Sequence, residues 1–325
     1  MLSDTLQARL ERLNRQSLGK AKVRTARHVK PKPAPKRRAI LPGEAVETPA
    51  GALWINRRPL AELCGSIAGI VAAAAGTDKA GGSLGVTDSG APPPHPEAVA
   101  LAESFPRDTL FLDLETCGFA GSMVFLIGLV RWADGQLVLE QLLARDYTQE
   151  RAILQSLWQS AADARLLVTF NGKSFDWPMV HDRSTYHRLG RDLRVDKKRR
   201  SKEEDASTSS PISTPREPLP ESGLGPRDTR PELAHADLLH HSRRKWRDHL
   251  PNCRLQTLEW YICGRRRAGD IPGSQIPATY HKFVRDGDPT RMRDVLHHNA
   301  LDLLTLVQLG HVLTQPNDTK LKAVA

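Results

Sequence analysis

Two carboxylates stand two residues apart in the stretch 111–118, which reads FLDLETCG. In a strand, Asp113 and Glu115 point to one face, and Leu112 and Leu114 point to the other. Two like charges on one face repel each other, so the arrangement is unfavourable unless a cation lies beside them. Hard oxygen ligands suit Mg²⁺ or Mn²⁺. We therefore expect a divalent-cation site on this strand; a solvated acidic face on an edge strand is the alternative.

A second polar pair lies near the C-terminus. His298 and Asp302 are four residues apart, which places them on one face of a helix with Cβ atoms about 5–6 Å apart. Leucines flank Asp302 on both sides, so its carboxylate is expected to be buried and to need a counter-charge. His297 also precedes this acid, but its five-residue spacing carries it away from that face. A solvated polar helix face is the alternative for the pair.

A third acid, Asp176, follows an apolar run at 165–170 that predicts a buried strand. Pro178 suits the first turn of a helix that starts beside this acid. Asp176 could therefore join the other acids, or it could only cap its own helix.

Apolar runs and turns predict the elements that position these acids. After the strand of Asp113 come the runs 124–132 and 137–143, joined by Asp134-Gly135, which is a strong hairpin signal. We expect three consecutive antiparallel strands, then a helix from about 148, the strand 165–170 and a helix after Asp176. A short strand at 234–240 and helices at 242–247, 254–263 and 290–313 follow, with a loop over 271–277. This is a mixed α/β order.

The flanking segments differ in composition. Residues 20–38 hold nine Lys or Arg, three prolines and no acid, which predicts an extended basic arm that contacts nucleic acid or only solubilises the chain. Residues 51–104 are rich in Gly, Ala and Pro and predict a linker, although Trp54 and Leu60 could dock on the domain. We expect a largely disordered extension at 1–104 with a short helix at 2–18. A folded domain at 105–315, with a disordered insertion at about 191–231, and a tail at 316–325 would follow.

Charge and cysteine content limit the partners. The 325 residues carry a formal net charge of +10 and have a pI of about 9.7, which favours nucleic acid first and an anionic membrane surface second. The longest apolar run, 67–75, is too short to cross a bilayer, and charges interrupt any signal peptide. The four cysteines are scattered, without a CxxC pair, which is typical of a reducing compartment. We expect a cytoplasmic protein without a membrane role.

Together these segments resemble the DnaQ-like 3′–5′ exonucleases of the ribonuclease H superfamily, and more closely its YprB-like branch. The similar stretches are FNGKSFD at 170–176, DLLH at 237–240, RRKW at 243–246, DIPG at 270–273 and HNALD at 298–302. The resemblance spans about 107–190 and 232–314. It leaves out the first hundred residues and the insertion.

The resemblance implies a ribonuclease H-like fold with a mixed five-stranded sheet, three antiparallel strands then two parallel, flanked by helices. It implies two ions of Mg²⁺ or Mn²⁺ held by Asp113, Glu115, Asp176 and Asp302. These would support two-metal hydrolysis of phosphodiester bonds, as a 3′–5′ exonuclease on single-stranded DNA or RNA. Family members place a Tyr four residues, or a His five residues, before the last acid. His298 occupies the first spacing and His297 the second, so both are candidate bases, with His298 favoured by its helical face.

Other residues are candidates for contact with the substrate or for structural roles. Trp177 and Trp246 could stack on bases, or they could pack inside the domain. Asp237 and Asp270 are expected to be cap or loop residues. A nucleic-acid-binding or scaffolding protein that has this fold without catalysis is the second hypothesis. The residues expected to contact nucleic acid are Asn171, Lys173, Arg243, Arg244 and Lys245.

Overall fold

The computed structural model describes residues 40–76, 95–119, 121–189 and 233–315. The expected N-terminal helix, the basic arm, the insertion and the tail lie outside these ranges. Among the described residues, no helix combines the length and the apolar character that crossing a membrane requires. The four cysteines are free thiols.

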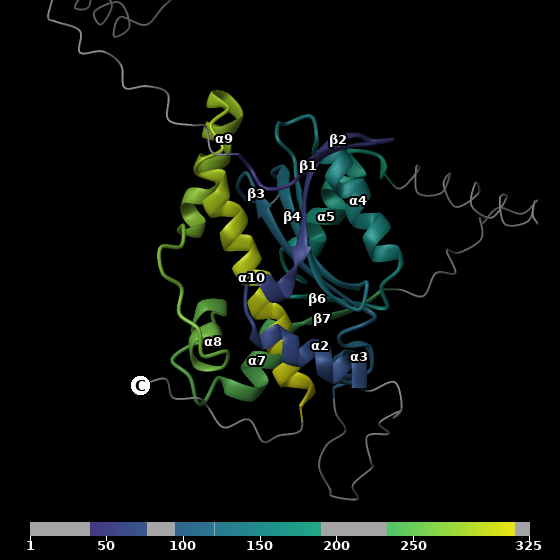
Figure 1. Cartoon of the computed structure of the whole chain (residues 1–325), viewed down its shortest axis with the longest axis vertical. Helices are drawn as coiled ribbons and strands as arrows, with labels where there is room; N and C mark the ends of the chain where they lie inside the picture. Colours follow the sequence, from purple (N-terminus) through teal and green to yellow (C-terminus); the bar gives the residue numbers. More distant parts are fainter. Residues whose placement is uncertain (1–39, 77–94, 120, 190–232, 316–325) are drawn as a thin grey trace, which may run out of the picture. The chain divides into compact units, whose positions relative to one another are not determined.

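A single sheet lies at the centre of the described region (Figure 1). Its strand order is β1-β2-β5-β4-β3-β6-β7. The pairs from β1 to β3 are antiparallel, whereas β3–β6 and β6–β7 are parallel. Strands β3 to β7 therefore form the mixed sheet that the sequence predicted. The strands are β1 (Glu44–Thr48), β2 (Gly51–Pro59), β3 (Thr109–Thr116), β4 (Val124–Ala133), β5 (Gln136–Leu143), β6 (Leu166–Thr169) and β7 (Ala234–Asp237).

The sheet has two strands more than the five predicted. The extra strands, β1 and β2, come from the segment expected to be disordered extension and linker, and β2 pairs with β5. Leu53 and Leu60 are fully buried beside them, so this segment is part of the packed structure. The sequence did not predict β2, because Asn56, one of its buried side chains, is polar and interrupts the apolar pattern of a strand. The domain boundary at 104/105 stays a prediction.

The β4–β5 hairpin forms where the sequence predicted it. Asp134 and Gly135 have φ values of 50° and 75°, and the strands resume their pairing at Ala133 and Gln136. Positive φ at both central residues matches the right-handed twist of the flanking strands. The turn therefore fixes the register of β4 against β5, which places Gly128 opposite Gln141.

Helices cover both faces of the sheet (Figure 1). Leu110 and Leu112 of β3 lie in one core cluster with buried residues of α4 (Glu150–Ala162) and α5 (Asp176–Tyr186), and buried residues of α9 (Ile276–Asp286) belong to the same cluster. Phe111 lies in the core of the opposite face, which α10 (Met292–Thr314) crosses. Around α10 on that face lie α2 (Ser66–Gly76), α3 (Pro96–Ser104), α7 (Leu238–Trp246) and α8 (Leu255–Tyr261).

Two expected boundaries were wrong for local reasons. The strand expected at 234–240 ends at Asp237, because the side chain of Asp237 accepts the Leu239 N–H and starts α7 at once. The loop expected over 271–277 gives way to a short 3₁₀ turn (Gly273–Gln275), and α9 then begins at Ile276. Pro277 is compatible with this start because the first turn of a helix leaves its N–H groups unpaired.

Candidate functional site

The two acids of β3 face α10. Phe111 belongs to the core beneath α10, and the two-residue period of a strand brings Asp113 and Glu115 to the same face. Opposite Asp113, a Cβ on Gly128 would lie 2.2 Å from Asn299 Oδ1. The absence of a side chain there lets α10 approach the sheet. Asn299 Nδ2 then donates a hydrogen bond of 2.8 Å to Asp113 Oδ2.

A chain of buried amides continues from Asn299 across the sheet. Gln141 Nε2 on β5 donates to Asn299 Oδ1 at 2.9 Å, and Asn56 Nδ2 on β2 donates to Gln141 Oε1 at 2.9 Å. All three amide side chains are buried. Each bond fixes the orientation of the next amide. We call this chain, Asn56–Gln141–Asn299, the amide relay; it connects β2 to Asp113.

The four predicted acids form one electrostatically coupled group. Burial and then the charges of Asp302, Glu115 and Asp176 raise the pKa of Asp113 well above its ordinary value, against the hydrogen bond from Asn299. Burial, followed by Asp302 and Asp176, likewise raises the pKa of Glu115. Segments distant in sequence therefore bring these carboxylates together. In the described residues, no three of the four acids bring their oxygens within 4.8 Å of one another. An ion held by three of these acids at once would therefore require the carboxylates to move closer.

Asp176 opens α5 beside a loop that Asp237 holds. Burial and then the charge of Asp237 raise the pKa of Asp176 to about 7. Asp237 itself is fully buried and accepts the N–H groups of Asn171 at 2.7 Å, Lys173 at 3.2 Å and Leu239 at 3.0 Å. Its predicted role as a cap is confirmed, and it also anchors the loop that leads to Asp176.

Arg267 supplies the counter-charge that Asp302 was expected to need. Its Nη2 donates to Asp302 Oδ1 in a short contact, its Nε to Glu259 Oε2 at 2.7 Å and its Nη1 to Asp270 Oδ2 at 3.1 Å. Although burial opposes it, Asp302 and Glu259 raise the pKa of Arg267, so the guanidinium stays charged. Sequence reasoning missed Arg267 because it follows two other arginines and resembles part of a surface basic run. The signal that could have found it was the counter-charge that Asp302 needs.

His298 lies between two carboxylates. Its Nδ1 is 2.9 Å from Asp270 and its Nε2 is 3.3 Å from Asp302 Oδ2. His298 is buried, whereas His297 is exposed. The structure therefore brings His298 to the acids. Asp270 has a loop position, as expected, and in addition it orients this imidazole.

Residues 110–314 match the sequence profile of the RNase_H superfamily. The chain belongs to this superfamily. It is also similar to the uncharacterized protein YprB of Bacillus subtilis (strain 168), with 34% identity over 212 residues. That match covers 64% of this chain and 42% of YprB, so the chain spans less than half the length of that relative. These findings confirm the YprB-like, ribonuclease H-like assignment and associate the chain with nuclease-type enzymes.

The basic residues expected to contact nucleic acid in this RNase H-like domain differ in their surroundings. Lys173 Nζ pairs with Glu97 Oε1 at 2.8 Å, and Arg244 Nη2 lies 3.0 Å from His241 Nδ1. Arg243 is exposed. It borders a groove of about 510 Å³ that Phe170, Asn171, Leu239, Asn252, Cys253, Arg254 and Leu255 also line.

The two tryptophans considered for base stacking differ in burial. Trp246 is 3% exposed, and Lys245 Nζ lies 5.6 Å from the centre of its ring. Trp177 is half-buried and packs against Trp158 and His181. Packing inside the domain therefore accounts for Trp246, whereas base stacking by Trp177 stays a prediction.

Proposed function

We propose that this chain is a metal-dependent nuclease that hydrolyses phosphodiester bonds, acting as a 3′–5′ exonuclease on single-stranded nucleic acid. The observation that supports it most directly is the coupled group of Asp113, Glu115, Asp176 and Asp302. Holding four half-buried carboxylates close to each other is unfavourable for stability. We attribute this unfavourable arrangement to a functional requirement for the combined negative charge of the four acids.

The chemistry of this group fits divalent cations. All its donors are carboxylate oxygens, which Mg²⁺ and Mn²⁺ prefer. The raised pKa values of Asp113 and Glu115 indicate a shortage of positive charge that such ions would supply. In the proposed enzyme Asp113, Glu115, Asp176 and Asp302 would hold two ions. When bound, the ions provide Lewis acidity that stabilises charge on the oxygens of the phosphodiester.

The neighbouring side chains have defined roles in this proposal. Asn299 holds one oxygen of Asp113 and leaves the other free to bind a cation. His298 Nε2 accepts the proton of the attacking water, while Asp270 on Nδ1 fixes the ring. Arg267 holds Asp302 on the side of α8. Asp302 Oδ2 must move away from His298 Nε2 before this nitrogen accepts the proton, because the two atoms now face each other at 3.3 Å.

The groove beside Asn171 suits a single strand. Phe170 extends β6, the parallel neighbour of β3, so the groove opens next to the strand that carries the acids. Phe170 and Leu255 offer apolar surface for a base, and the exposed Arg243 and Arg254 offer positive charge for phosphates. Paired duplex bases would not expose their faces to such a groove.

One observation favours the second hypothesis, nucleic-acid binding without catalysis. Asp302 already has a charged partner in Arg267. If that ion pair persists, one of the four acids is occupied and the group binds cations weakly.

The decisive experiment incubates the purified full chain with end-labelled single-stranded DNA and RNA, in Mn²⁺ or Mg²⁺ and in EDTA. We expect a ladder of shortening products that EDTA abolishes and that Asp113→Asn reduces by about 10²-fold or more. Asp108→Asn, an exposed acid just before β3, is the matched control and should retain activity. Cleavage that survives Asp113→Asn would identify a contaminant, and binding without cleavage would support the second hypothesis.

A further inference from the structure

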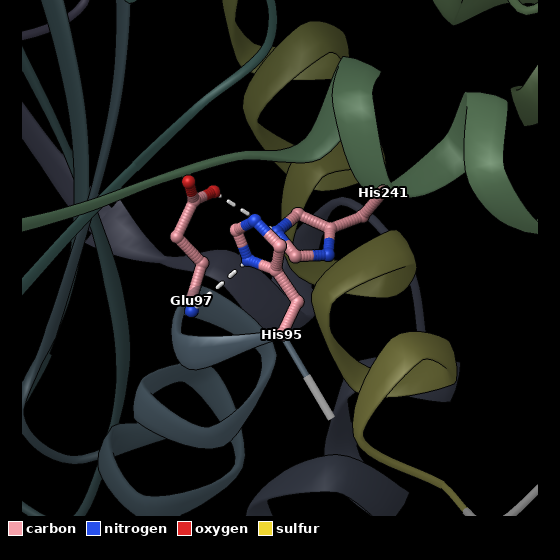
Figure 2. Close-up of side chains that lie close together, drawn as sticks. All are labelled: His95, Glu97 and His241. Carbon is pink, nitrogen blue, oxygen red and sulfur yellow. Dashed lines mark hydrogen bonds and ion pairs between the residues drawn. The ribbon is translucent and has the colours of Figure 1, made fainter. Parts of the chain in front are cut away.

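Three side chains outside the acidic site converge on one point (Figure 2). His95 and Glu97 lie at the start of α3, and His241 lies in α7. One donor atom from each lies within 4.8 Å of the others. In Figure 2 a nitrogen of His241 points to the carboxylate of Glu97, and a nitrogen of His95 points to the Glu97 backbone nitrogen.

The donors have a spacing and chemistry that suit a transition-metal ion. Glu97 Oε2 and His241 Nε2 are 3.0 Å apart, and two ligands of a tetrahedral Zn²⁺, each about 2.0–2.1 Å from the metal, stand about 3.3 Å apart. Two imidazoles and a carboxylate are typical Zn²⁺ ligands, whereas Mg²⁺ prefers oxygen alone. The trio differs in this respect from the four acids.

The charge states of the trio are those that metal binding requires. His241 is 7% exposed, and burial lowers its pKa, although the hydrogen bond to Glu97 acts in the opposite sense. Burial opposes the ionisation of Glu97, yet hydrogen bonds from Lys173 and His241 lower its pKa to about 2. Near neutral pH the trio therefore offers a neutral imidazole beside an anionic carboxylate, and a proton occupies the place of a cation between them.

Two cationic side chains compete with an ion at this point. Arg244 Nη2 donates to His241 Nδ1, which leaves the imidazole proton on Nε2. Ligation through Nε2 moves that proton to Nδ1 and displaces Arg244. Lys173 holds the other oxygen of Glu97. His95 Nδ1 accepts the Glu97 N–H at 3.3 Å, so binding a metal through its other nitrogen costs this helix cap.

We propose that His95, Glu97 and His241 form a binding site for a zinc-class divalent cation, separate from the carboxylate group on β3. Bound there, the ion joins α3 to α7 through Glu97 Oε2, beside the oxygen that pairs with Lys173. The Asp237 N–H also donates to Glu97 Oε2 at 3.3 Å. The site therefore adjoins the loop of Asn171 and Lys173 that Asp237 holds.

The test measures Zn²⁺ binding to the full chain by competition with a chromophoric chelator, with Mg²⁺ in excess. We expect the wild type to bind one Zn²⁺ that Mg²⁺ does not displace. His241→Ala and Glu97→Gln should weaken this binding by roughly tenfold or more, and His95→Ala by less. Arg244→Met should strengthen it, because the competing guanidinium is gone.

Control variants distinguish Zn²⁺ binding at the trio from Zn²⁺ binding elsewhere in the molecule. His240→Ala removes the exposed histidine next to His241, and Asp302→Asn alters the acidic group; both should bind Zn²⁺ as the wild type does. No Zn²⁺ binding by the wild type, or equal binding by wild type and His241→Ala, overturns the proposal. If His241→Ala does not fold, His95→Ala decides, because it removes an exposed ring.

Discussion

A buried guanidinium among three carboxylates is the least expected feature of the acidic site. Arg267 contacts Glu259, Asp270 and Asp302, and its side chain is 7% exposed. Such a cluster is stable only while every charge has its partner, because an unpaired buried charge is expensive. Because the same guanidinium binds Asp302 Oδ1, it also limits the binding of a cation by Asp302.

Replacing Arg267 should therefore have two opposite effects. We expect Arg267→Met to lower the free energy of unfolding in EDTA by about 3–5 kcal/mol at neutral pH, since it removes the guanidinium that contacts Glu259, Asp270 and Asp302. Mn²⁺ should recover more stability in this variant than in the wild type. Chemical unfolding with and without Mn²⁺ measures both. Arg266→Met, at the exposed neighbour, is the control, and equal losses in the two variants would contradict the role of Arg267.

Asp176 predicts a pH dependence of stability. Its folded-state pKa of about 7 lies above the reference value of about 3.9 for an unfolded Asp. The folded chain thus holds this proton more tightly, so stability falls as pH rises from about 4 to about 7. In EDTA, Asp176→Asn should change the free energy of unfolding little at about pH 4 and raise it at about pH 8. Between about pH 4 and about pH 7 the difference from the wild type should grow by up to about 1.4 kcal/mol per pH unit.

Unfolding curves of Asp176→Asn at several pH values measure this slope. Asp182→Asn, an exposed acid of the same helix, should show the slope of the wild type. A pH-independent effect of Asp176→Asn would mean that this carboxyl titrates normally in the folded chain.

Among the elements, β2 has an unexpected position in the site. It lies outside residues 110–314, the part that matches the superfamily, yet its Asn56 begins the amide relay that reaches Asp113. The strand therefore pairs with the edge of β5 and, through the amide relay, helps to orient Asp113.

Breaking the relay at β2 should affect the acids at a distance. Asn56→Leu leaves Gln141 Oε1 buried without a donor, which we expect to cost about 1–3 kcal/mol of stability. It should also weaken Mn²⁺ binding, because Asn299 then loses its fixed orientation. Unfolding and calorimetric Mn²⁺ titration measure the two effects. Glu47→Gln, exposed on β1, is the control, and unchanged Mn²⁺ affinity in Asn56→Leu would show that β3 alone positions Asp113.

At the scale of the whole molecule, positive charge is concentrated near the N-terminus. Nine of the 47 Lys and Arg residues fall within 20–38, where no acid offsets them. Charge of this kind binds phosphates without reading sequence, and the affinity falls as salt rises.

Removing residues 1–38 tests whether the arm contacts nucleic acid. We expect the shortened chain to show a smaller slope of log affinity against log salt, by about 0.7 for each lost phosphate contact on a single strand. Fluorescence anisotropy with labelled single strands measures the slope in EDTA. The full chain carrying Asp113→Asn should keep the full slope, and identical slopes with and without the arm would mean that the arm only solubilises.

Local sequence was sufficient for several features of the fold and the site. The alternation around Asp113, the Asp134-Gly135 turn and the helix of His298 all appear where they were predicted, because each depends on residues a few positions apart. The motifs along these elements, such as FNGKSFD at 170–176 and HNALD at 298–302, were enough to indicate a resemblance to the superfamily. The same local rules failed at β2, where a buried polar residue interrupts the apolar pattern, and at Arg267, where a buried cation resembles its exposed neighbours.

The sequence by itself determined the types and order of the acids and the strands and helices that carry them, since periodicity and turn chemistry act between close neighbours. Only the tertiary structure decided which polar groups became partners. Asn56 and Gln141 are 85 positions apart, Gln141 and Asn299 are 158 apart, and Glu97 and His241 are 144 apart. Buried polar groups must find partners wherever the fold brings them, and no local pattern encodes that choice.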